Sequence, residues 1–181
     1  MKRIAIAAAA AFLALGSAHA QMRSPWYAEL GWTHMKIDAG GASARPDAIR
    51  LLGGYDFHPF FALEGFIAGG INDDSKDVNI NGVPGNVTVK LKNMYGIFAK
   101  PKYDINQFQV FGRLGWAHTK VSVDSATPAL VTSENSNAFA WGLGANFKFT
   151  PNAYVGADWM RYNNHGGHQV DGLTLSVGWH F

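Results

Sequence analysis

The chain has 181 residues, of which 48% are hydrophobic and only 15% are charged, well below the ~25% charged share of ordinary soluble domains. It contains no cysteine, which excludes a disulfide scaffold, and after its N-terminus no stretch approaches the ~18 consecutive apolar residues of a membrane helix. Setting aside Lys2 and Arg3, which belong to the segment described next, leaves 13 of the 15 basic residues against 13 acidic ones. This neutrality gives no electrostatic case for nucleic acid as a partner, and the length indicates one domain.

The first twenty residues have the pattern of an export signal. Lys2 and Arg3 precede an apolar run over 4–15, and Ala18-His19-Ala20 follows. A basic start, a short apolar core and a small-residue cleavage site are typical of a secretory signal peptide. The alternative, an N-terminal anchor helix, needs a longer apolar core. We therefore predict a signal peptide over 1–20 and one exported domain over 21–181.

Alternation of apolar and polar residues begins at Trp26 and predicts a β-strand with two different faces. The same period of two returns along the chain, and clusters of Gly, Pro, Asn and Asp separate the repeats. Eight strands are thus predicted, over residues 26–33, 47–56, 61–70, 87–101, 108–118, 137–148, 153–162 and 172–181.

The connections between the predicted strands alternate between short and long. The short ones cover 58–60, 102–107 and 149–152, and the long polar ones cover 38–46, 71–86, 119–136 and 163–169. This alternation is typical of an up-and-down antiparallel sheet with an even number of strands. We predict an all-β fold, an eight-stranded antiparallel barrel with four long loops at one end.

The two faces of these strands differ in chemistry. One face is apolar and includes Leu51, Leu63 and Leu114, whereas the other carries charges among many glycines. A soluble lipocalin-like barrel would turn the apolar face inward, and a membrane barrel would turn it into lipid. Aromatic residues near both strand ends, including Tyr154 by the short turns and Tyr162 towards the long loops, form two belts as at membrane interfaces. The belts favour the transmembrane barrel.

The polar face carries three acids and three bases, which we expect to meet in the bore. We predict Arg50 beside Glu64, and Lys100 close to Arg113. A structural network is one interpretation, because an unpaired buried charge costs several kcal/mol. A gate whose alternative pairings open a narrow pore is the other. The predicted interior charge network consists of Glu29, Arg50, Glu64, Lys100, Arg113 and Asp158.

Five short segments, taken together and in their order along the chain, resemble those of a known family. They are 53–57, 61–65, 99–103, 112–116 and 141–145. With them, residues 21–181 resemble the eight-stranded outer-membrane barrels of Gram-negative bacteria, the OmpA transmembrane-domain, OmpX and opacity-type superfamily. The resemblance implies an outer-membrane location, with lipid and lipopolysaccharide around the barrel. Because the chain stops at the last strand, no cell-wall tethering domain is expected after it.

The last strand ends in an aromatic residue after alternating apolar ones. This pattern resembles the terminal signal that the barrel-assembly machinery recognises in outer-membrane proteins. Its predicted residues are Leu175, Val177, Trp179 and Phe181.

Enzymatic and metal sites are not expected. Lipid A 3-O-deacylases of similar length carry His-Tyr-Ser-Asn on the penultimate strand, where this chain has Arg161-Tyr162-Asn163-Asn164, which lacks both base and nucleophile. His165 and His168 would need further ligands to bind a metal, and the aspartates at 73, 74 and 77 lack the spacing of a calcium loop. No cofactor is expected. The predicted function is a structural or surface-interaction role, with host or cell-surface ligands bound by the loops; a small gated channel is the alternative.

Overall fold

The computed structural model describes residues 24–39, 42–71, 74–80, 83–125, 132–165 and 168–181. These residues form strands and turns, and among them no helix has the length and apolarity to cross a membrane. The strands are β1 Trp26–Ala39, β2 Ala42–Ala44, β3 Asp47–His58, β4 Phe61–Gly70, β5 Asp74–Ile80, β6 Val83–Ile105, β7 Phe108–Ser125, β8 Thr132–Lys148, β9 Ala153–His165 and β10 His168–His180.

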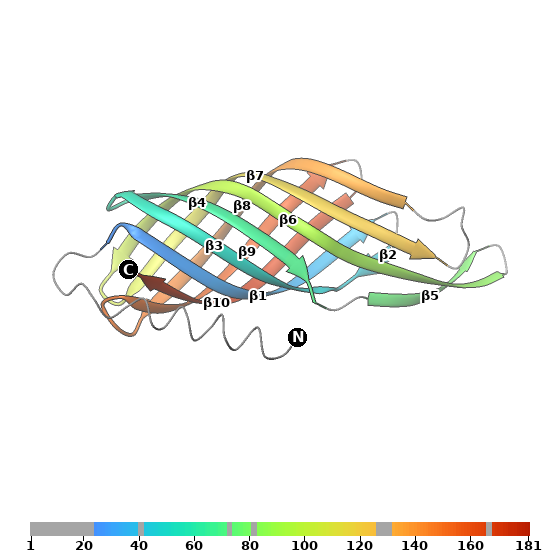
Figure 1. The fold of residues 1–181 in the computed structure, drawn as a ribbon, viewed down its shortest axis with the longest axis horizontal. Coiled ribbons are helices and arrows are strands. Elements are labelled where there is room, and N and C mark those ends of the chain that lie inside the picture. The colour runs from blue at the N-terminus through green and yellow to red at the C-terminus, as the bar shows by residue number, and fades with distance from the viewer. Residues whose placement is uncertain (1–23, 40–41, 72–73, 81–82, 126–131, 166–167) are drawn as a thin grey trace.

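Eight of these strands close into an antiparallel barrel, which confirms the predicted fold (Figure 1). Their order around the barrel is β1, β3, β4, β6, β7, β8, β9 and β10, and β10 pairs with β1 from Tyr27 opposite His180 to Ala39 opposite His168. Each strand pairs with its neighbour in the chain, so only local hairpins and one closure are needed. The short strand β2 pairs with the C-terminal end of β1, and β5 pairs with the N-terminal end of β6.

The barrel strands run further than the alternating pattern predicted. β6 covers Val83–Ile105 where we predicted 87–101, and β7 continues to Ser125 through part of the predicted loop 119–136. The predicted loop 71–86 instead contains β5 and the start of β6. Backbone N–H and C=O groups pair whatever the side chains are, so the ladder continues into polar sequence. Much of the long-loop region is therefore strand.

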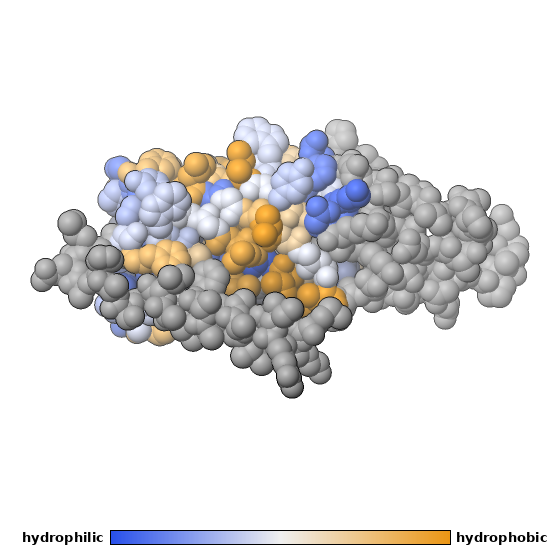
Figure 2. Space-filling model, viewed as in Figure 1, coloured by the Kyte–Doolittle hydropathy of each residue, from blue (hydrophilic) through white to orange (hydrophobic). Residues whose placement is uncertain are grey.

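The outer surface of the barrel is the apolar face. Leu63 on β4, Leu114 on β7 and Leu143 on β8 are each about half exposed, at 56%, 48% and 64%. Figure 2 shows hydrophobic residues across the middle of one side of the barrel, with more hydrophilic residues towards its ends. A water-soluble barrel would bury these side chains in its core. The lipocalin-like alternative is therefore wrong, and the apolar face is built to contact lipid.

Aromatic pairs lie on the outer surface near both ends of the apolar band. Beside the short turns, the Phe60 and Tyr103 rings stack with centroids 6.1 Å apart. Towards the long connections, Trp116 meets Phe139 edge to face at 5.8 Å. Rings in such belts keep an apolar body in the membrane and a polar edge at its surface.

Two of the aromatic residues that we predicted for the belts do not belong to them. Tyr154 and Tyr162 are 2% and 1% exposed and lie inside the barrel, which corrects their predicted place in the belts. The alternation along β9 explains the difference, because both residues share the inward parity of Asp158. Their hydroxyls take part in the interior network described below.

Candidate functional site

The six charged residues predicted to meet in the bore come from six different strands. Each side chain is almost completely buried, with exposures between 0% and 3%. Strand alternation turns every one of them inward, and closure of the barrel brings the strands together around a narrow axis. The residues are Glu29 on β1, Arg50 on β3, Glu64 on β4, Lys100 on β6, Arg113 on β7 and Asp158 on β9.

Arg113 is the centre of this network and contacts all three acids. Its Nε donates to Glu64 Oε2 at 2.5 Å, its Nη1 to Asp158 Oδ1 at 2.6 Å, and its Nη2 to Glu29 Oε2 at 3.3 Å. A guanidinium has five N–H donors in a fixed plane, so one side chain can bind several carboxylates. Arg113 therefore joins strands from opposite sides of the barrel.

Arg50 binds two of the same acids and not the one predicted. Its Nη2 donates to Glu29 Oε1 at 2.7 Å and its Nη1 to Asp158 Oδ2 at 2.9 Å. The register corrects the predicted Arg50–Glu64 pair, because Arg50 lies opposite Ala68 on β4, four residues beyond Glu64. One donor, the Nε of Arg50, is buried without a hydrogen-bond partner.

Lys100 lies beside Arg113, and both share Glu64. The Lys100 Nζ is 2.8 Å from Glu64 Oε1, and it also lies 4.4 Å from the centroid of the Phe111 ring. The Arg113 guanidinium lies 4.6 Å from the same ring centroid. The negative face of an aromatic ring attracts both cations. Phe111 thus helps to hold two like charges close together.

Three tyrosines complete the network, and the sequence interpretation did not include them. Tyr27 donates to Glu64 Oε1 at 2.6 Å, and Tyr154 donates to Glu29 Oε2 at 3.3 Å. The Tyr162 hydroxyl accepts from Arg50 Nη1 at 3.4 Å. All three residues have the inward parity of their strands, so the alternation itself was the signal that could have found them.

Inward glycines make room for these rings. Gly178 lies opposite Tyr154 on the neighbouring strand, and a Cβ at Gly178 would lie 2.0 Å from the Tyr154 Cζ. Gly54 has the same relation to Tyr27, at 2.2 Å. An aromatic ring laid over a cross-strand glycine covers the bare backbone. The glycines of the polar face therefore position the tyrosines that bind the acids.

Replacing Gly178 by alanine is expected to lower the free energy of unfolding by about 1–3 kcal/mol, because the added methyl group displaces the Tyr154 ring. Urea unfolding in detergent, followed by tryptophan fluorescence, measures the change. Gly53→Ala is the matched control, since a Cβ at Gly53 meets no atom within 4 Å. Equal losses in the two variants would contradict this role for Gly178.

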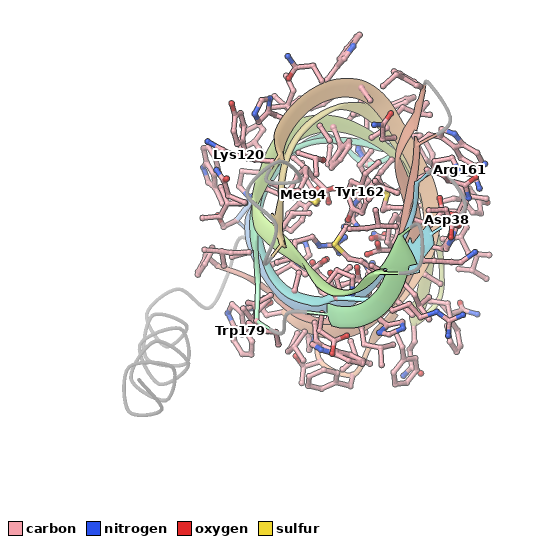
Figure 3. The ribbon with its side chains drawn as sticks, turned by 90° about the vertical axis from the view of Figure 1, so that its right-hand side faces the viewer. Asp38, Met94, Lys120, Arg161, Tyr162 and Trp179 are labelled. Carbon is pink, nitrogen blue, oxygen red and sulfur yellow. The ribbon has the colours of Figure 1, made fainter. Side chains whose placement is uncertain are left out.

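An apolar layer lies in the bore next to the charges. The Phe66 ring stacks on Phe98 at 5.1 Å and approaches Tyr162 at 5.9 Å, and Met94 and Met160 are buried with them. Figure 3, viewed along the barrel, shows Met94 and Tyr162 pointing into the bore, whereas Lys120 and Arg161 point outward. Ionic and apolar layers together fill the middle of the barrel with side chains.

A second polar group lies nearer the short turns, and sequence reasoning did not single it out. Lys102 pairs with Asp56 at 2.5 Å, and His180 lies 3.5 Å from the same carboxylate. Gln109 and Asn146 hydrogen-bond to each other at 3.1 Å. These residues narrow the bore at the end beside the short turns.

The remaining predicted residues lie elsewhere. Leu175 and Val177 face outward on β10, and Arg161 binds Asp171 on the outer surface with its Nε 2.9 Å from Oδ1. The side chains of His165 and His168, and those of residues 73, 74 and 77, lie outside the described part of the structure.

Comparison with protein families decides what kind of barrel this is. Residues 5–181 match the family described as the outer membrane protein beta-barrel domain. The chain belongs to this outer-membrane barrel family. The protein is therefore located in the outer membrane, with the apolar face towards lipid and the charges inside. A comparison with curated protein sequences found no match.

Solved structures of outer-membrane proteins share the fold at low sequence identity. Ail of Yersinia pestis, in complex with the heparin analogue sucrose octasulfate, has a TM-score of 0.64 at 19% identity, covering 88% of this chain and 100% of Ail. Neisserial surface protein A has a TM-score of 0.64 at 16% identity, covering 89% of this chain and 100% of that one. OprG of Pseudomonas aeruginosa has 0.62 at 13%, covering 88% and 97%. This outer-membrane barrel thus resembles proteins of the Ail, surface protein A and OprG type.

Proposed function

We propose that this outer-membrane barrel is a non-catalytic surface protein that binds ligands outside the cell, with the membrane part as a closed anchor. Strand length is the observation that carries the proposal. A strand needs ~9–11 residues to cross the outer membrane, whereas β6 has 23 residues, β7 has 18 and β8 has 17. The additional residues of β6, β7 and β8, together with β5, continue the sheet beyond the membrane part at the end opposite the short turns. We call this part of the sheet the extension, and it is visible on the right of Figure 1.

The filled bore supports the same function. Ionic and apolar layers occupy the axis, so the membrane part has a structural role and the extension remains as the binding surface. A sulfated glycan is the first ligand class to test, because the similarly folded Ail was crystallised with a heparin analogue. The segment 74–92 also carries the three lysines Lys76, Lys90 and Lys92, against the two aspartates Asp74 and Asp77.

Removal of the extension tests this function. Replacing residues 72–85 and 121–134 by short Asn-Gly turns, together with Lys90→Ala and Lys92→Ala, is expected to keep the barrel folded and to reduce binding of heparin by at least tenfold. Binding is measured with the mature protein in nanodiscs, and folding by the heat-dependent mobility of the barrel on gels. Unchanged binding of heparin and of whole cells to host surfaces would overturn the proposal.

A small gated channel is the second candidate, and the sharing of acids favours it. Arg50 and Arg113 both bind Asp158 and Glu29, so a guanidinium can exchange partners without leaving a carboxylate unpaired. Single-channel recording in a planar bilayer tests the gate. Discrete openings that change with Arg113→Ala would establish it, and a closed trace in both proteins would leave the charges as a structural plug.

Export and assembly complete the proposal. The segment 1–20 serves as a cleaved signal peptide, and Leu175, Val177, Trp179 and Phe181 serve as the recognition signal for the barrel-assembly machinery. These four residues lie on or next to β10, the strand that closes the barrel against β1.

A further inference from the structure

Two glycines leave a depression in the lipid-facing surface. Gly53 on β3 and Gly65 on β4 both face outward and lie directly opposite each other in the sheet. A Cβ at Gly53 would meet no atom within 4 Å, and one at Gly65 would meet only the Gly96 carbonyl oxygen at 3.9 Å. Glycine weakens a strand and often marks a place where a ligand approaches the backbone closely. Neither glycine is required by packing.

The depression is the floor of a groove of about 640 Å³ that crosses β3, β4, β6 and β7 and reaches Asn137 on β8. Leu51, Ile67 and Tyr95 lie opposite one another in one row of the lining. The two glycines lie in the next row, which continues through Ile97 and Trp116, since Gly65 lies opposite Ile97 and Ile97 opposite Trp116. The volume lies within the ~300–1,000 Å³ of small-molecule sites.

The groove is apolar at one end and polar at the other. At the polar end, His118 Nδ1 and Asn137 Oδ1 are 2.6 Å apart, and the Tyr95 ring stacks on His118 at 4.8 Å. Lys120 faces outward two residues further along β7 (Figure 3). The glycine end has no such polar side chain among its described lining residues.

The polar end is also the end nearer the outside of the cell. His118 lies ten residues along β7 from Phe108, and Gly65 lies four residues along β4 from Phe61. With ~3.3 Å per residue and a strand tilt of ~40°, these positions are roughly 25 Å and roughly 10 Å from the short turns. The apolar band of such barrels is ~25 Å tall. The groove therefore runs from the outer interface towards the middle of the membrane.

We propose that this groove binds one acyl chain of an outer-leaflet lipid, with the lipid phosphate at His118 and Lys120. The two glycines let the acyl chain approach the protein backbone, and the apolar side chains of the lining contact its sides. The cationic end of the groove meets the anionic headgroup. Both the groove and the lipid are apolar towards the middle of the membrane and polar towards its outer surface. A second copy of this chain would not require the cationic end, whereas an anionic lipid does.

A lipid-retention experiment tests the proposal. The mature protein is folded in detergent, mixed with phosphatidylglycerol and measured by native mass spectrometry. We expect one tightly retained lipid, and at least a fivefold loss of retention in the double variant Gly53→Leu, Gly65→Leu, whose side chains fill the groove. Because added Cβ atoms meet no close contact, the variant is expected to fold. Gly53→Ala, Gly65→Ala is a milder second variant with an intermediate loss expected.

The control fills an equivalent position away from the groove. Ala145 on β8 and Ala157 on β9 are also small, exposed and opposite each other. Ala145→Leu, Ala157→Leu is expected to retain the lipid like the unchanged protein. Equal loss in the filled-groove and control variants would mean ordinary lipid contact around the barrel and would overturn the proposal.

The headgroup and the copy number are tested separately. Diacylglycerol, which lacks the phosphate, is expected to be retained at least fivefold less than phosphatidylglycerol, and the double variant His118→Ala, Lys120→Ala is expected to remove this preference. Equal retention of both lipids by the unchanged protein would overturn the phosphate assignment. A dimer that the filled-groove variant dissociates would show that a second copy occupies the groove, and it would overturn the acyl-chain proposal.

Discussion

Replacement of Arg113 by methionine is expected to lower the free energy of unfolding by about 3–5 kcal/mol, the largest effect of any single change in the bore. Arg113 is completely buried and binds Glu29, Glu64 and Asp158. Without it, three buried carboxylates have only two remaining cations nearby. Urea titration of the barrel refolded into lipid vesicles measures the change.

The same experiment separates loss of charge balance from loss of packing. Adding Glu64→Gln to Arg113→Met removes one acid as well as one base, and we expect it to recover part of the loss. Lys36→Met, on the outer side of β1, is the control and is expected to change stability by less than about 0.5 kcal/mol, because the Lys36 side chain is half exposed. If Arg113→Met and Lys36→Met have equal effects, the network does not stabilise the barrel.

Replacement of Leu114 by arginine is expected to destabilise the barrel by about 2–4 kcal/mol, because it places a cation in the middle of the membrane. Leu114 is next to Arg113 in the chain, yet its side chain points into lipid with 48% exposed. One strand thus carries an arginine that is required and a neighbouring position where arginine is not tolerated. Folding of both proteins into lipid vesicles at increasing urea concentrations measures the change in the free energy of unfolding.

The depth of the substituted residue provides the control. Ile105 is half exposed at the end of β6 beside a short turn, and Ile105→Arg is expected to cost only about 0–1 kcal/mol. Gln109 faces the bore and hydrogen-bonds to Asp104 and Asn146. Gln109→Ala removes these bonds without placing a charge in the membrane, and it is expected to lower the free energy of unfolding by about 1 kcal/mol. A Leu114→Arg protein that folds normally in water without detergent would contradict the lipid-facing orientation.

Arg113 and Leu114 lie on opposite faces of one strand, and both expected results agree with the proposed role of the barrel as a membrane anchor. A bore closed by interlocked charges and an apolar layer anchors the protein, while the apolar outer face holds it in the membrane. The strands that continue beyond this anchor are then free to vary without loss of the barrel.

The period of two determined most of the fold. From Trp26 to the last strand, alternation predicted eight strands, their antiparallel order and the inward direction of all six charges, because each residue has a fixed face once its strand is known. The same alternation places Tyr154 and Tyr162 inside the barrel, although their positions near the strand ends led us to assign them to the belts.

The sequence by itself therefore determined the strands and the face of each residue, down to the buried positions of Glu29 and Arg113. Only the tertiary structure decided that Arg50 binds Glu29 and Asp158, that β6 extends to Val83, and that Gly53 meets Gly65 on the lipid face. The physical reason is register. Alternation repeats every two residues, so it sets which way a side chain points, but the level at which it meets its neighbours depends on backbone pairing around the whole closed barrel.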